Sequence, residues 1–176
     1  LKLSVLRGGL EALTEDEQTE YFAGLKGTYN YTDLNRVGEA INYVAEQLKQ
    51  LAYEVDAYRE SKGVANDPTL RMPYDPETII VNPKTDWVME DYPTLATSAN
   101  YISNLTKIYN VIPNLPESIP KVPITLDNLT FEKANAIEQM LKAVSEYAFA
   151  LKDLIIARID LVVLGYEYTG ITYTGM

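Results

Sequence analysis

The sequence of 176 residues contains no cysteine and no histidine. The lack of cysteine excludes disulfides, thiolate nucleophiles and zinc–thiolate sites. The lack of histidine excludes a Ser-His-Asp triad and imidazole metal ligands. A phosphate-binding glycine motif is also missing. Carboxylates, lysines, hydroxyls and tyrosines remain for chemistry. We expect no cofactor, no metal site and no catalytic residues among them.

Positive charge is scarce, with 15 lysines and arginines against 25 aspartates and glutamates and a formal net charge of −10. Nucleic acids and anionic membrane surfaces are bound by clustered Lys and Arg, so neither is expected as a partner. No apolar run approaches the roughly 20 residues that cross a bilayer. The apolar share of 47% is typical of a folded chain of one domain, or of two small ones.

The clearest helical signal is a heptad seam in which apolar residues alternate at spacings of three and four. Its members are Leu34, Val37, Ile41, Val44, Leu48, Leu51 and Val55. Such a seam has to be buried, either inside an intramolecular bundle or against a second copy of the chain. The pattern favours the intramolecular core and leaves self-association open. Candidate interface residues under the second reading are Leu34, Val37, Ile41, Val44 and Leu48.

Two further long helices are predicted. One begins at Thr94 or Leu95 and ends at Ile112, because prolines flank it on both sides. The other starts after Thr130, repeats the heptad spacing over residues 134–155 and ends before Gly165. A straight helix of that extent is roughly 50 Å long, against roughly 40 Å for a compact globule of this chain length, so we expect an elongated molecule.

The segments between these helices complete the predicted organisation. A helical segment spans residues 1–56 and includes a short helix at 15–23, and an irregular proline-containing excursion follows at 57–93, with strand character only at 78–81. Residues 94–164 form a two-helix segment with a proline-rich connection at 113–123. The predicted fold class is mainly α: an elongated bundle of three long helices plus one short, with a small Tyr/Gly-rich β segment at 165–176.

That last segment carries three tyrosines that we expect to need a partner. Tyr166, Tyr168 and Tyr173 are spaced through threonines and glycines, and Tyr-Thr-Gly occurs twice. An unpaired strand of this kind is a liability for a monomer. We predict that it pairs with a neighbouring chain or continues into further polypeptide, which makes the three tyrosines candidate assembly residues.

The acidic cluster around Trp87 is the remaining candidate for chemistry. Asp86, Glu90 and Asp91 could in principle bind calcium or act as an acid–base pair on a glycan. The favoured interpretation is a solvated loop that Trp87 anchors to the core. Trp87 is also a candidate ring for stacking on a sugar, although exposed aromatic rings more often mark protein assembly.

Four blocks in the same order give the chain a resemblance to uncharacterised structural proteins of phages and prophages of Gram-positive gut bacteria. The blocks are residues 27–37 (GTYNYTDLNRV), Thr85-Asp86-Trp87 followed by Tyr92-Pro93-Thr94, the helix at 129–141, and the two Tyr-Thr-Gly repeats. The chain departs from the pattern at Gly38, where Glu is expected, and at Ala99, where a polar residue is expected.

The resemblance implies a non-enzymatic virion protein, tail-associated at the tail tip, baseplate or fibre attachment. It also implies synthesis in the cytoplasm of the bacterial host and assembly with copies of itself and with other virion proteins. The alternative is a host-surface module of a tail fibre that binds cell-wall glycan through Trp87 and surface tyrosines. No catalytic residues are carried over from the resemblance.

Overall fold

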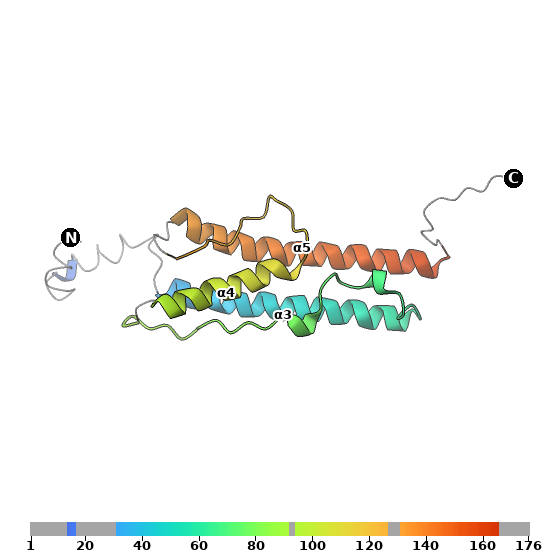
Figure 1. Ribbon diagram of the computed structural model, residues 1–176, viewed down its shortest axis with the longest axis horizontal. Coiled ribbons are helices and arrows are strands. Elements are labelled where there is room, and N and C mark those ends of the chain that lie inside the picture. The colour runs from blue at the N-terminus through green and yellow to red at the C-terminus, as the bar shows by residue number, and fades with distance from the viewer. Residues whose placement is uncertain (1–13, 17–30, 92–93, 127–130, 166–176) are drawn as a thin grey trace.

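The computed structural model describes residues 14–16, 31–91, 94–126 and 131–165. These ranges contain three long helices, α3 (Tyr31–Ser61), α4 (Leu95–Val111) and α5 (Phe131–Val163), and the short 3₁₀ helices η2 (Pro68–Leu70) and η3 (Pro76–Thr78). The predicted mainly helical class is confirmed, and the described part of the molecule is elongated along α3 and α5 (Figure 1). The predicted β segment lies outside the described residues, apart from Gly165, as does most of the short helix at 15–23.

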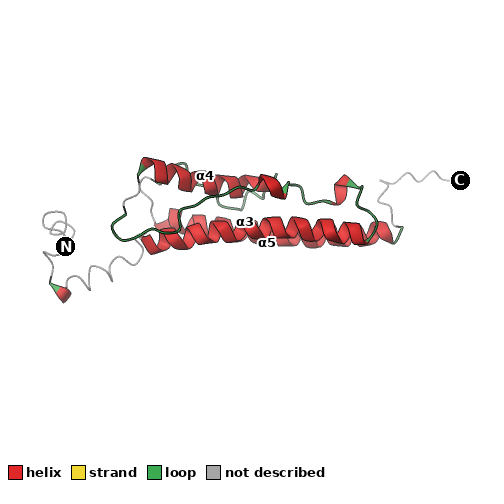
Figure 2. Ribbon diagram, turned by 90° about the horizontal axis from the view of Figure 1, so that it is seen from below, coloured by secondary structure: helices red, strands yellow, loops and turns green. Residues whose placement is uncertain are grey.

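Helices α3 and α5 lie side by side and point in the same direction (Figures 1 and 2). Four side-chain contacts join them: Arg36–Glu138, Gln47–Ser145, Glu54–Lys152 and Tyr58–Asp160. The sequence separations of these pairs stay between 98 and 102 along the whole length. An antiparallel pair would change this separation steadily, so the contacts establish a parallel register.

The two heptad seams meet in that register. Residues 34–55 of α3 and 134–155 of α5 have the same alternation of three and four, offset by a separation that matches the contacts. Leu34, Val37, Ile41, Val44 and Leu48 are all buried within one chain. They therefore form the intramolecular core that the sequence favoured. Their alternative role in self-association stays a prediction.

Both seams change spacing at the same level, after Val55 and Ile155. The next buried position in each helix comes four residues later, at Arg59 and Ile159, where the alternation would place it three residues later. The extra residue in the spacing locally unwinds a heptad pair. The Arg59 side chain is only 1% exposed, and its Nη1 donates to the Asp67 carbonyl at 2.8 Å. This buried turn explains why α3 continues to Ser61, past the boundary at residue 56 that the failing periodicity predicted.

Because the three helices run in the same direction, each connection has to return along the molecule. Residues 62–91 pass back from the end of α3 towards its start, and residues 112–126 run from the end of α4 towards the start of α5 (Figure 1). The first return segment packs tightly on α3 at Gly38, where an added Cβ would lie 2.6 Å from the Lys84 carbonyl oxygen. This contact explains why glycine stands where the resemblance predicts Glu.

The predicted strand at residues 78–81 is wrong. Thr78 ends η3, and no strand lies beside this segment in the described part of the chain. Side chains of α4 take up the backbone groups instead: Lys107 Nζ donates to the Ile80 carbonyl at 2.8 Å, and Asn104 Oδ1 accepts from the Asn82 amide at 2.8 Å. The segment is therefore extended without being part of a sheet.

Helix α4 lies on one side of the α3–α5 pair and covers about half of its length (Figure 2). Its predicted bounds are confirmed, and its start is capped by Thr94, whose side chain forms a reciprocal capping box with Thr97. The predicted end of the last helix is also confirmed: α5 stops at Val163, and Gly165 adopts φ +79°. Within the described ranges, no helix has the length and apolar character needed to cross a membrane.

Candidate functional site

A groove lined only by α3 and α5 runs along the described part of the chain, and we call it the α3–α5 groove. One hollow of about 450 Å³ lies between residues 36–47 of α3 and 138–146 of α5. A second hollow of about 320 Å³ continues it along residues 43–54 to Phe149. The two hollows share Tyr43 and Gln47, so they form one continuous depression.

The floor of the groove is apolar, and polar side chains cross it. Val37, Val44 and Leu141 form the floor and belong to the buried core. Ser145 Oγ donates to Gln47 Oε1 at 2.9 Å, and other crossings are made by the α3–α5 ion pairs. Each of these polar contacts joins an α3 residue to the α5 residue beside it. The parallel register of the two helices therefore determines which side chains span the groove.

Two exposed aromatic rings line the groove. Tyr43 is 64% exposed and Phe149 is 40% exposed. Gln47 Nε2 donates to the Tyr43 hydroxyl at 2.8 Å, which holds that ring beside the floor. The Lys152 ammonium lies 5.7 Å from the centre of the Phe149 ring. Exposed rings over an apolar floor are typical of protein interaction surfaces.

Charge on the groove is mixed, unlike the strongly acidic chain as a whole. Charges of both signs lie around it. The cations are Arg36, Lys142 and Lys152, and the carboxylates are Glu46, Glu54, Glu138 and Glu146. Hydrogen bonds from Gln50 and Lys152 lower the pKa of Glu54 below its ordinary value, which keeps that carboxylate charged. The groove can therefore meet a surface that carries both signs.

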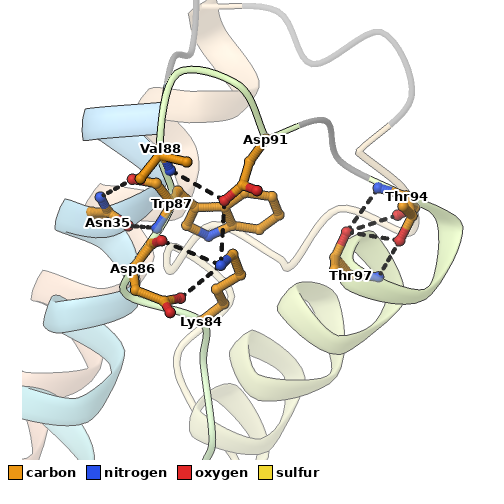
Figure 3. A network of polar contacts seen from close by, with 8 residues as sticks. All are labelled: Asn35, Lys84, Asp86, Trp87, Val88, Asp91, Thr94 and Thr97. Atoms are coloured by element: carbon orange, nitrogen blue, oxygen red, sulfur yellow. Dashed lines mark hydrogen bonds and ion pairs between the residues drawn. The ribbon is translucent and has the colours of Figure 1, made fainter.

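Trp87, the candidate for sugar stacking, lies in the core rather than on the surface. It is 4% exposed, and Asn35 of α3 fixes its backbone: the Trp87 amide donates to Asn35 Oδ1 at 2.7 Å, and Asn35 Nδ2 donates to the Trp87 carbonyl at 2.9 Å (Figure 3). A sugar cannot stack on this ring while the return segment holds its position. The sequence identified the anchoring role of Trp87 but missed Asn35, whose amide gives no signal of its own within a helical pattern.

The acidic residues around Trp87 surround a lysine. Lys84 Nζ lies 2.7 Å from Asp86 Oδ1 and 3.3 Å from Asp91 Oδ2, and 5.2 Å from the centre of the Trp87 ring (Figure 3). The hydrogen bond from Lys84 lowers the pKa of Asp86, and the reverse interaction raises the pKa of Lys84. In the part of the chain that the structure describes, no group of three or more acidic side chains is arranged to hold a metal ion. The contacts of Asp86 and Asp91 join the return segment to itself.

Beside this cluster, a hollow of about 540 Å³ separates residues 82–87 from the start of α4. Asn100 and Thr97 contribute to its α4 wall, and Asp86 contributes to the opposite wall. The hollow has a more polar lining than the α3–α5 groove. It offers hydrogen-bonding groups to a small polar ligand, although the faces of its aromatic residues are buried.

No protein-family model, no curated protein and no solved structure matches this chain. The resemblance to phage structural proteins therefore stays a prediction from the four sequence blocks. The candidate assembly residues Tyr166, Tyr168 and Tyr173 lie outside the described residues, and their proposed role also stays a prediction.

Proposed function

We propose that this protein is a non-enzymatic structural component that acts by assembling with copies of itself and with other proteins. The observation that supports this function is the one-sided bundle. Helix α4 covers one side of the α3–α5 pair, whereas the α3–α5 groove retains an apolar floor and two exposed rings. Surfaces of this composition are typical of protein–protein contacts.

The setting that we propose is a bacteriophage virion, where the protein is associated with the tail at its tip, at the baseplate or at a fibre attachment. The sequence resemblance supports this setting, and the elongated shape suits it. Helix α3 has 31 residues, so it extends over roughly 46 Å at about 1.5 Å per residue. A parallel pair of this length is a stiff spacer that can present a side surface to neighbouring subunits.

Two measurements test the proposal. Light scattering on the purified full chain should show an oligomer at micromolar concentration, and a folded monomer at high micromolar concentration would contradict self-assembly. Mass spectrometry of purified particles from a host that carries the gene should find the protein in the virion. Its consistent absence from intact particles would leave a self-assembling protein without the proposed phage role.

The alternative proposal is a host-surface module that binds cell-wall glycan. The polar hollow beside residues 82–87 supports this alternative, because sugar hydroxyls can bond with Asn100 and Thr97 there. Sugar binding would then depend on hydrogen bonds and not on stacking against an exposed ring. A pull-down with purified cell walls, competed by millimolar free sugar, tests this function. Binding that the Asn100→Ala variant abolishes would support it, and the absence of any retained protein would remove it.

A further inference from the structure

We infer that the α3–α5 groove is where two copies of this chain pair face to face, with Tyr43 and Phe149 of each copy packed against the groove of the other. This inference rests on the proposed self-assembly and names the surface that performs it. Three properties of the groove support a second copy as its occupant: its apolar composition, its area and its pattern of charge.

The apolar composition comes from residues that the chain's own fold leaves partly uncovered. Tyr43 of α3 and Phe149 of α5 both line the second hollow of the groove and are both exposed. In the inferred pairing, the rings of one copy enter the depression of the other. A few residues near the centre of an interface carry most of its binding energy, and tyrosine is enriched among them.

The area is sufficient for a specific dimer. The groove extends over residues 36–54 of α3, which is roughly 27 Å of helix, and a helix pair is roughly 20 Å wide. A face of that size buries roughly 1,100 Å² when both copies are counted, which reaches the lower limit of about 1,000 Å² for a biological interface. A small ligand would leave most of this elongated face uncovered.

The charge pattern suits a second copy of an acidic chain. On α3 the groove carries Arg36 near its start and Glu54 near its end. On α5 the order is reversed, with Glu138 at the level of Arg36 and Lys152 at the level of Glu54. When α3 of one copy lies over α5 of a second copy in the same direction, opposite charges meet at both ends, and Glu46 meets Glu146 of the other copy between them. The opposite pairs therefore offset part of the repulsion that the net charge of −10 produces at this face.

Sedimentation velocity on the full chain and four variants tests the inference. Phe149→Glu and Tyr43→Glu place a carboxylate on the interface, and Leu154→Glu adds the same charge on α5 at a residue that is 60% exposed and outside the groove lining. We expect a dimer for the unaltered chain, a dissociation constant raised at least tenfold in each groove variant, and no change for Leu154→Glu. Tyr43→Ala adds no charge and should weaken the dimer in the same direction.

Circular dichroism on each variant establishes that it is folded, which is expected because all three positions are exposed. If the unaltered chain is a dimer and the folded groove variants dimerise as tightly, the groove inference is overturned and the proposed self-assembly stands. If the unaltered chain is a monomer, both are overturned. Equal weakening by Leu154→Glu would show a general effect of charge and would also overturn the assignment to the groove.

Discussion

At the scale of single residues, the arrangement depends on side chains that hold segments distant in sequence together. Asn35 fixes the backbone of Trp87, and Arg59 joins the end of α3 to Asp67 of the return segment. Gly38 provides the space that the Lys84 carbonyl needs. Each of these residues occupies a position on α3 where a helical pattern alone accepts many other residues.

Gly38→Ala should destabilise the protein, although glycine to alanine inside a helix normally stabilises by about 1 kcal/mol. The added Cβ would lie 2.6 Å from a backbone oxygen and 3.0 Å from Thr85 Cγ2, so the return segment must shift, at a cost of about 1–3 kcal/mol. Urea unfolding measures the change, with Glu39→Ala at the neighbouring exposed position as the control. Increased stability of the Gly38 variant would show that the close packing is absent in solution.

Asn35→Ala should release the Trp87 backbone, because both of its hydrogen bonds end on Asn35. Leaving these backbone groups unpaired costs about 1–3 kcal/mol. Trp87 is the only tryptophan, so its fluorescence should shift to the red as water reaches the ring. The control is Asn42→Ala on the exposed side of the same helix, and an unchanged emission spectrum in the Asn35 variant would contradict the proposed clamp.

At the scale of helices, the α3–α5 pair combines a buried seam with polar contacts on its surface. The seam supplies the hydrophobic stabilisation. The polar contacts fix the register of the two helices, because each one joins side chains at the same height along α3 and α5. Surface pairs of this kind contribute little individually, about 0–1 kcal/mol. Their effect is therefore best seen through their dependence on pH.

We expect stability to fall as the pH drops below the ordinary carboxylate range. A hydrogen bond from Tyr58, followed by the charge of Lys62, lowers the pKa of Asp160 from 3.8, and bonds from Gln50 and Lys152 lower that of Glu54 from 4.5. A carboxylate with a lower pKa in the folded state stabilises the protein above its unfolded pKa, and this contribution is lost as the pH falls through the folded value.

Urea unfolding at pH 7, 5 and 3 measures this dependence. Stability should change little between pH 7 and 5 and should fall between pH 5 and 3. The double variant Glu54→Gln with Asp160→Asn should be less stable at pH 7 and should lose less on acidification than the unaltered chain. An identical loss in both proteins would show that other carboxylates are responsible.

At the scale of the whole molecule, three parallel helices require two long returns. A connection along α3 has to cover roughly 46 Å, which needs at least about 14 extended residues, and residues 62–94 exceed this length. The returns also complete the core, since Leu70, Ile79, Ile112 and Ile119 are buried in the same cluster as the helices. The described part of the molecule is therefore a single packed unit.

A fragment of residues 31–165 should fold by itself, because, among the residues that the structure describes, the buried cluster lies between Leu34 and Ile159. We expect cooperative thermal unfolding and helical circular dichroism in proportion to its length. If the α3–α5 groove is the dimer surface, the fragment should also dimerise like the full chain. Loss of dimerisation with retained folding would assign self-assembly to the remaining segments, where Tyr166, Tyr168 and Tyr173 lie.

The sequence by itself determined the helices and their buried faces. Heptad spacing, Thr94 and Gly165 predicted α3, α4 and α5 to within a few residues, because helical periodicity and end signals act over a few neighbouring residues. The strand prediction at 78–81 failed because a strand needs a pairing partner, and here side chains of α4 bond with the backbone instead.

Only the tertiary structure decided which surface each seam packs against and whether the two helices run parallel or antiparallel. A heptad seam specifies its buried face but not its partner, and an antiparallel pair or a second copy would bury residues 34–55 equally well. The long return segments select the parallel pair within one chain. The side-chain contacts between α3 and α5, from Arg36–Glu138 to Tyr58–Asp160, do the same. The core position of Trp87 and the exposed rings of the α3–α5 groove follow from that choice, because burial depends on contacts between residues far apart in the sequence.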